Sequence, residues 1–440
     1  MTEPRLTAAA LPNLPPSIAR PTYALDRTRI GIVHLGAGAF HRAHQAVYID
    51  DLLANEPDWA ISAVSLHSPQ VRDALRPQDG LYALALLDEH PELRIIGAIR
   101  EVLCAQDEQP AVLARLADPA VRLVTLTVTE KGYCLAGGPL DVAHPDIVHD
   151  LAAPHAPRSA IGYLVAGLRE RLRLGLAPYT VLSCDNLPDN GGKLRRAVLQ
   201  FAYALDPALA AWIETEATFP RSMVDSITPA SDDALRERVA AQLGCEDAWP
   251  IQRERYSQWV IEDRFCNGRP AFERAGVTLS DDIAGFDRAK LRLLNGPHSA
   301  LAYLGSLLGL ETVADAMHHP QLAAFVETLM RDDIAPTLQP TPGFDPQHYT
   351  RRHPRPLPQP RHRPPAGADR LGRLAKTPGA PARQHRRRPG RRPPHRPPVP
   401  ADRGVDAVRA AAGVRWRGPG GPDERGAERD RASRNWRCRP

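Results

Sequence analysis

The sequence lacks several features that would assign it to a membrane or secreted class. It has no run of about 18 apolar residues, the length that a transmembrane helix needs. Residues 1–20 are rich in Pro and Ala but contain no apolar core of signal-peptide type. Its six cysteines show neither the paired spacing of a disulfide framework nor that of a zinc site. We therefore expect a cytoplasmic protein with reduced thiols and no membrane partner.

Basic charge is also scarce over most of the chain, although the formal net charge is +5. Residues 351–440 contain 24 Arg, 1 Lys and 7 acidic residues, whereas residues 1–350 carry 31 basic and 44 acidic residues, a net charge of −13. An acidic body argues against nucleic acid as a partner. The length of 440 residues is sufficient for two or three domains.

A strand, a glycine turn and a helix are predicted near the N-terminus. Residues 29–35 form a short apolar run of buried-strand type, and the turn Gly36-Ala37-Gly38 precedes a helical pattern. This order is typical of the start of a dinucleotide-binding unit, although His41 stands where a third glycine is expected. His41 and His44 have no Glu or Cys partner at a recognised metal-site spacing, so packing or cofactor contact fits them better than metal binding.

Further strand-like runs at residues 59–66, 121–129 and 179–184 alternate with helical stretches such as residues 160–174. This alternation predicts an α/β fold with a parallel sheet and a site at the carboxyl ends of its strands. No Asp or Glu follows the run 59–66, where His67 and Ser68 stand instead, so the choice between NAD and NADP stays open. From Asp281 to Met330 the pattern becomes mainly helical.

The stretch that begins at Lys290 contains an expected helix joint. Leu291, Leu293 and Leu294 predict the buried face of one helix. Gly296 is expected to stop that helix, and Pro297 suits the first position of the next one.

Such a joint would bring Lys290, Asn295 and His298 together. An amine, an amide and an imidazole could take a proton from an alcohol and stabilise its oxygen as the charge changes. A lysine becomes a general base near neutral pH where burial disfavours its charged form. A surface lysine, a helix-capping asparagine and a core histidine are the structural alternative.

Six stretches, in this order, resemble the polyol-specific long-chain dehydrogenase family, which includes mannitol 2-dehydrogenase, arabinitol dehydrogenase and fructuronate reductase. They are residues 36–44, 127–133, 183–188, 223–225, 258–263 and 290–298. After a lead of residues 1–26, the resemblance implies a Rossmann-like NAD-binding domain over residues 27–280. A mainly α-helical C-terminal domain would begin at residues 281–350, with the active site between the two domains.

The resemblance also implies a role for individual residues. Lys290 resembles the general base of the family, and Asn186 and Asn295 resemble the pair that stabilises the substrate oxygen. His298 and Asp225 match positions that bind or orient substrate, and Asp287 matches an acidic proton-relay position where the family often has Glu. Gly36, Gly38, Ala39 and Phe40 match the cofactor-binding turn.

The implied reaction is metal-free hydride transfer between NAD, with NADP not excluded, and a secondary alcohol of an open-chain sugar acid or polyol. Residues 127–134 and 295–305 look closest to fructuronate reductases. We therefore expect D-fructuronate and D-mannonate first, with fructose and mannitol as the alternative. The oligomeric state stays open, with a monomer among the states that fit.

Hydrophobic periodicity ends after Thr350. Residues 351–440 contain 17 Pro beside their 24 Arg, a composition that opposes a packed core. A disordered basic tail and an Arg-rich nucleic-acid-binding segment are two interpretations. A third is a frameshift, because the codons for residues 372–377, read one base later, permit Asp-Gly-Ser-Gln-Lys-Leu, which resembles a segment of the family. We expect the frameshift, which would truncate the C-terminal domain and leave an inactive relic.

Overall fold

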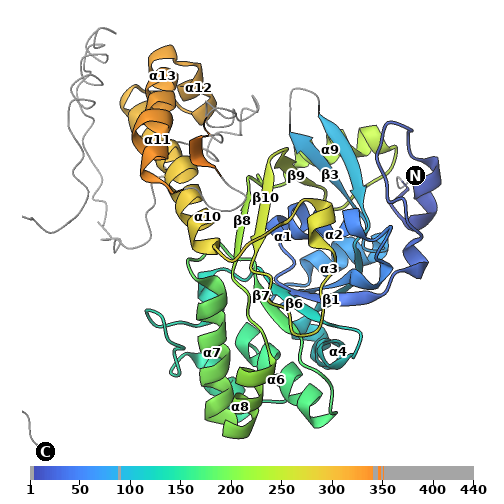
Figure 1. Ribbon diagram of the computed structural model, residues 1–440. Helices are drawn as coiled ribbons and strands as arrows, with labels where there is room; N and C mark the ends of the chain where they lie inside the picture. Colours follow the sequence, from blue (N-terminus) through green and yellow to red (C-terminus); the bar gives the residue numbers. More distant parts are fainter. Residues whose placement is uncertain (1–3, 88–90, 340–344, 348–349, 351–440) are drawn as a thin grey trace, which may run out of the picture.

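The computed structural model describes residues 4–87, 91–339, 345–347 and 350. Figure 1 shows a larger body built on β-sheets and a helical part that begins at α10 (Ile283–Lys290). The expected disorder of residues 351–440 concerns a segment outside the described residues, so it stays a prediction.

A five-stranded sheet forms the centre of the larger body, and every neighbouring pair of its strands is parallel. Its order is β5-β2-β1-β6-β7, so β2 and β5 lie on one side of β1, and the chain crosses to the other side between β5 and β6. Ligands of such sheets bind at this switch point, beyond the carboxyl ends of the strands. The strands are β1 (Ile30–Leu35), β2 (Ala60–Ser65), β5 (Ile99–Cys104), β6 (Leu123–Leu126) and β7 (Thr180–Ser183). The predicted parallel α/β sheet is therefore confirmed.

Both faces of this sheet are buried, which is why its strands read as continuous apolar runs. In β1, Val33 and Leu35 belong to one hydrophobic core and Ile32 belongs to the other. The first core lies under α4 (Ala105–Ala117), α5 (Pro145–Ala152), α6 (Ala160–Arg173), α7 (Asn190–Leu205) and α8 (Pro207–Glu216). The second lies under α1 (Ala39–Ala43), α2 (Gln45–Leu52) and α3 (Gln70–Leu75).

Two smaller sheets flank this core. One consists of β8 (Ser222–Ser226), β10 (Ser257–Ile261) and β11 (Thr278–Leu279), and the other of β3 (Tyr82–Leu87), β4 (Glu92–Ile96) and β9 (Ile251–Glu254). The N-terminal lead packs Leu6, Leu14 and Ile18 against α9 (Asp233–Leu243) and the β3–β4 pair. Short 3₁₀ turns lie at Ala8–Asn13, Leu25–Arg27, Pro57–Trp59, Arg76–Gln78, Glu130–Tyr133 and Phe272–Ala275.

The predicted change to helix after Asp281 is also confirmed. The helices are α10, a π-helical turn (Leu291–Asn295), α11 (Gly296–Leu307), α12 (Val313–His318) and α13 (Pro320–Thr328). A second π-helical segment (Leu329–Ile334) and a 3₁₀ turn (Ala335–Thr337) follow. Ile283 and Phe286 of α10 pack against Met223 and Val260, which fixes α10 on the β8–β10 sheet.

The expected helix stop at Gly296 is wrong. Gly296 has right-handed helical angles (φ −59°, ψ −56°), and the chain continues from α10 through the π-helical turn into α11. The physical reason is Pro297, which cannot donate a hydrogen bond to the Leu293 carbonyl and whose ring would collide with it in a regular α-helix. The π-helical turn directly before Pro297 widens the helix and changes its hydrogen-bond pattern, so the helix continues instead of ending. The expected leucine face is only partly present, because Leu293 is buried while Leu291 is 62% exposed.

Within the described residues, no helix is both long and apolar enough to span a membrane.

Candidate functional site

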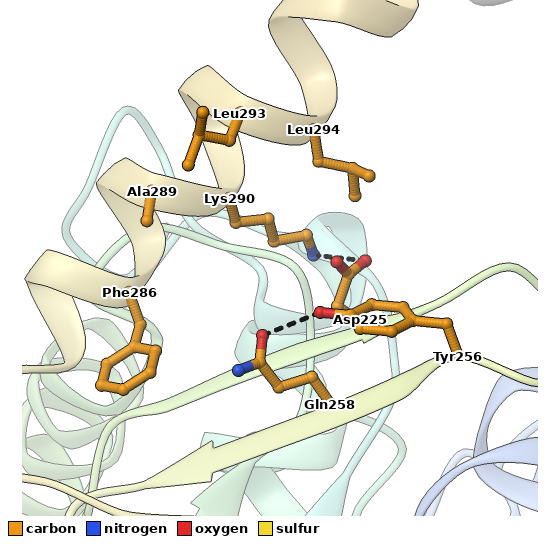
Figure 2. A pocket seen from close by; sticks show the side chains of 8 residues that line it. All are labelled: Asp225, Tyr256, Gln258, Phe286, Ala289, Lys290, Leu293 and Leu294. Atoms are coloured by element: carbon orange, nitrogen blue, oxygen red, sulfur yellow. Dashed lines mark hydrogen bonds and ion pairs between the residues drawn. The ribbon is translucent and has the colours of Figure 1, made fainter. Parts of the chain in front are cut away.

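A small recess lies where α10 and the π-helical turn meet strands β8 and β10 (Figure 2). Its apolar wall comes from the helical side, and its polar groups come from both sides. The lining residues are Asp225, Tyr256, Gln258, Phe286, Ala289, Lys290, Leu293 and Leu294. The recess therefore lies between the sheet body and the helical part, as the resemblance implied for the active site.

Lys290 is the last residue of α10, and its amine points across the recess to the body (Figure 2). Its Nζ donates to the Val224 carbonyl at 2.5 Å and to Asn186 Oδ1 at 3.3 Å. Nζ also lies 3.5 Å from Asp225 Oδ1. Three acceptors therefore surround the Lys290 amine.

Asp225 supplies the negative charge at this junction. It lies on β8 opposite Gln258 of β10, and 11% of its side chain is exposed. Burial raises the pKa of the Asp225 carboxyl, while the Lys290 charge and hydrogen bond oppose that rise. Lys290 and Asp225 thus form a largely buried pair whose two charges depend on each other.

Asp287 lies one helical turn before Lys290 on α10. Burial raises the pKa of its carboxyl to about 6, against the opposing effect of Lys290, Arg221 and Arg288. A carboxyl that titrates near neutral pH can both accept and release a proton, which is what a relay requires.

The structure does not bring all predicted site residues together. Among the described contacts, no hydrogen bond or ion pair joins Lys290 to Asn295 or His298. Asn295 is exposed at the end of the π-helical turn. His298 lies on α11, where its Nε2 is buried without a hydrogen-bond partner and burial lowers the pKa of the ring. Asn186, which follows β7, takes the place beside the amine that the sequence pattern gave to Asn295.

Sequence reasoning missed three polar residues around Asp225. Tyr256 OH donates to Gln258 Oε1 at 3.0 Å at the floor of the recess (Figure 2). Glu254 is buried at the end of β9, and burial, followed by the Asp225 charge, raises its carboxyl pKa to about 7. Residues 258–263 carried the family motif, which was the available signal for Gln258, whereas Glu254 and Tyr256 had no comparable signal.

The glycine turn lies at the switch point of the central sheet. Gly36 has φ +99°, and a Cβ there would lie 2.2 Å from the Thr127 carbonyl oxygen, so only glycine fits. At Gly38 the nearest atom to a Cβ would be 3.8 Å away, so internal packing does not require glycine and the space above the turn is free. Ala39 and Phe40 follow as the first residues of α1. These residues fit the close approach of a dinucleotide pyrophosphate.

The two histidines of this turn are buried. His44 makes a 2.9 Å hydrogen bond through Nε2 to the Gln258 carbonyl, and His41 stacks on His34 with ring centroids 3.4 Å apart. No group of three or more potential metal ligands occurs among the described residues. Next to the turn, β2 ends at Ser65, and His67 and Ser68 are exposed beyond it.

Two sequence profiles match the chain. Residues 30–274 match the mannitol dehydrogenase Rossmann domain, and residues 282–380 match the mannitol dehydrogenase C-terminal domain. The second match extends past Thr350, where we expected the resemblance to end, into residues outside the described part of the chain.

Individual proteins match over most of their lengths. D-mannonate oxidoreductase of Escherichia coli (strain K12) is 46% identical over 345 residues, which are 77% of this chain and 71% of that protein. Polyol:NADP oxidoreductase of Gluconobacter oxydans (strain 621H) is 40% identical over 352 residues, 78% of this chain and 73% of that protein. Among solved structures, Pseudomonas fluorescens mannitol 2-dehydrogenase in ternary complex with NAD and D-mannitol is 40% identical with a TM-score of 0.75. That comparison covers 84% of this chain and 76% of that one.

Proposed function

The chain belongs to the mannitol dehydrogenase family, and from this premise we propose that it is an NAD(P)-dependent oxidoreductase. Its reaction would interconvert a secondary alcohol and a ketone on an open-chain sugar acid or polyol. The observation that carries the proposal is the Lys290 amine, held by Val224, Asn186 and Asp225 in a recess between the two parts of the molecule.

Lys290 would exchange the proton of the substrate oxygen. In ketone reduction its ammonium gives a proton to the oxygen, and in alcohol oxidation the amine takes that proton back. Asp287, with a carboxyl pKa of about 6, would pass the proton between Lys290 and solvent.

Asn186 and Asn295 would stabilise the substrate oxygen through their amide groups. Asn186 already contacts Lys290, whereas Asn295 would have to approach the oxygen from the helical side. Asp225 and His298 would orient the substrate hydroxyls. The buried, unpartnered Nε2 of His298 is free for such a contact.

The glycine turn would hold the cofactor through Gly36, Gly38, Ala39 and Phe40. When bound, NAD(H) or NADP(H) supplies the hydride acceptor or donor of the reaction. We propose NAD as the cofactor on the family resemblance. The absence of a carboxylate at His67 and Ser68 keeps NADP as the alternative, as in the NADP-linked relative.

D-fructuronate and D-mannonate are the proposed substrate pair, supported by the 46% identity with D-mannonate oxidoreductase. Fructose and mannitol are the alternative, supported by the similarity to mannitol 2-dehydrogenase solved with D-mannitol. The test is the rate of NADH and NADPH oxidation with D-fructuronate and with fructose, for wild type and Lys290→Ala.

Lys290→Ala should lose most of the turnover, by about 10²-fold or more, while dinucleotide affinity stays near wild type, because only the proton-exchanging group is removed. Wild-type-like turnover in Lys290→Ala would refute the assignment. Failure of the wild type to bind either dinucleotide would refute the proposed function as a whole.

We propose in addition that the chain is read in a shifted frame after about Thr350, which would make it a truncated relic. The proposal is supported by the shifted codons of residues 372–377 and by the Arg- and Pro-rich composition. The family match through residue 380 is the observation that opposes it. Sequencing the DNA around codons 345–356 tests the proposal, because an inserted or deleted base must be found there if the frame is shifted.

A further inference from the structure

A partly buried carboxylate joins two loops at the carboxyl edge of the central sheet. Asp185 follows β7, and its carboxylate accepts hydrogen bonds from three groups of the loop that follows the neighbouring strand β6. The donors are the Val128 N–H at 3.1 Å, the Thr129 N–H at 2.8 Å and Tyr133 OH at 2.7 Å. The mechanism proposed above assigns Asp185 no part.

The loop that Asp185 holds has an unfavourable backbone. Thr129 has φ +64° and ψ 166°, a region that is unfavourable for a β-branched residue. Such a conformation persists only where surrounding contacts impose it. Tyr133 is fully buried and its hydroxyl also contacts Ser183 Oγ at 2.5 Å, so its contact with Asp185 is firmly positioned.

Each end of this connection leads to a different part of the candidate site. Asn186, the residue directly after Asp185, contacts the Lys290 amine. On the other side, Thr127 Oγ1 donates to the Gly36 carbonyl at 2.8 Å, and the Thr127 carbonyl occupies the space that a Cβ at Gly36 would need. The same loop therefore touches the glycine turn and is joined through Asp185 to Asn186.

We propose that Asp185 is a positioning residue, which holds the Asn186–Lys290 contact in a fixed place relative to the Gly36 turn. This inference rests on the proposed function. Hydride transfer needs substrate and cofactor in one arrangement, and a displacement of about 1 Å costs about 10²-fold in rate. Asp185 acts through Asn186 and the Thr127–Thr129 backbone and need not touch the substrate.

Asp150 provides a matched control. Its carboxylate is fully buried and accepts from the Arg158 N–H at 2.8 Å, the Ser159 N–H at 2.9 Å and Ser159 Oγ at 2.7 Å. It thus accepts two backbone N–H groups and a hydroxyl, as Asp185 does, but none of these partners belongs to the candidate site.

The experiment compares the full-length wild type with Asp185→Asn, Tyr133→Phe and Asp150→Asn. An asparagine at 185 presents an NH₂ group to one of its former donors, so the loop must move. We expect kcat to fall about 10²-fold in Asp185→Asn, with KM for the sugar changed less than about threefold. In Tyr133→Phe, which removes one of the three hydrogen bonds to Asp185, kcat should fall less. Asp150→Asn should be less stable but keep the wild-type kcat.

Crystal structures of the same variants give a measurement that does not depend on activity. In Asp185→Asn, Thr129 should move to negative φ and the 3.3 Å contact between Asn186 and Lys290 should lengthen by about 1 Å, whereas Asp150→Asn should keep both features. If Asp185→Asn does not fold, Tyr133→Phe carries the same comparison. An unchanged Asn186–Lys290 contact, or an equal loss of kcat in Asp150→Asn, would overturn the inference. If the wild type turns over no sugar, a version with the reading frame restored after about Thr350 separates the two causes: absent turnover there as well means that the proposed function fails. The crystal structures then decide on Asp185.

Discussion

Replacing Lys290 with Met should show how strongly the buried carboxylate of Asp225 depends on the positive charge of Lys290. Methionine keeps the apolar stem that packs in the recess but removes the charge 3.5 Å from Asp225 Oδ1. The Asp225 carboxyl would then remain almost buried without a countercharge. Its pKa, already raised by burial, should rise further because the opposing effect of Lys290 is lost.

The expected magnitude follows from the burial of the pair. Removing one partner of a fully buried pair costs about 3–5 kcal/mol, because the other charge is left uncompensated. Here 12% of the Lys290 side chain and 11% of the Asp225 side chain are exposed, so water reduces the penalty. We expect a loss of about 2 kcal/mol in the free energy of unfolding at pH 8, or about 4–8 °C in Tm for a domain of typical size.

The loss should depend on pH with a definite sign. Above the raised pKa of Asp225 the unpaired carboxylate is ionised and the penalty is present. As the pH falls below that pKa the folded state takes up a proton and the penalty declines, and it is lost completely only below the Asp pKa of the unfolded chain, about 3.9.

The assay is thermal unfolding of wild type, Lys290→Met, Asp225→Asn and the double variant at pH 8 and pH 5. In the double variant the penalty should be absent at both pH values, because no charge is left buried. A loss in Lys290→Met of equal size at both pH values, or no recovery in the double variant, would refute the reasoning.

Three further predictions concern other parts of the site. In the wild type, kcat of alcohol oxidation should decline below about pH 6, because the Asp287 carboxyl accepts a proton only above its pKa of about 6, and Asp287→Asn should lose this decline. A pH profile of kcat that keeps the decline in Asp287→Asn would exclude Asp287 as the relay. Gly36→Ala should unfold at a lower temperature, since its Cβ would lie 2.2 Å from the Thr127 carbonyl, whereas Gly38→Ala should fold normally and lose dinucleotide affinity in a fluorescence titration. His67→Asp should change the ratio of the NADPH and NADH dissociation constants about tenfold or more in favour of NADH, because a carboxylate beyond β2 accepts a hydrogen bond from a ribose hydroxyl and repels a phosphate. An unchanged ratio would place the adenosine ribose elsewhere.

The central sheet could be predicted because its strands are buried on both faces. The apolar runs 29–35, 59–66, 121–129 and 179–184 correspond to β1, β2, β6 and β7, and the helical stretch 160–174 corresponds to α6. β5 and the two smaller sheets had no such signal. Most of these strands mix polar with apolar residues, as in Ile99–Cys104, and their pairing depends on partners far away in the chain.

The residues of the candidate site could be identified from the sequence, but most of the contacts between them could not. Lys290, Asn186 and Asp225 were all identified by resemblance, but nothing local in the sequence shows that the Lys290 amine reaches the Val224 carbonyl, which is 66 residues away. The expected grouping of Lys290 with Asn295 and His298 assumed that nearness in sequence means nearness in space. The helix does not end at Gly296, and the described contacts of the Lys290 amine are with Asn186, Val224 and Asp225.

Pro297 accounts for the continuation of the helix past Gly296 and for the placement of the amine. A turn at Gly296 would have folded α11 back over Lys290, whereas the π-helical turn carries α11 onward and leaves Asn295 exposed. Lys290 ends α10 just before the hydrogen-bond pattern changes, and Ile283 and Phe286 fix the start of the same helix on β8 and β10. The amine is therefore directed at the sheet body, where its acceptors lie. π-Helical turns inside α-helices are frequent at functional sites. The position of the Lys290 amine, the proposed general base, depends on a proline seven residues later in the chain, through the shape of the helix between them.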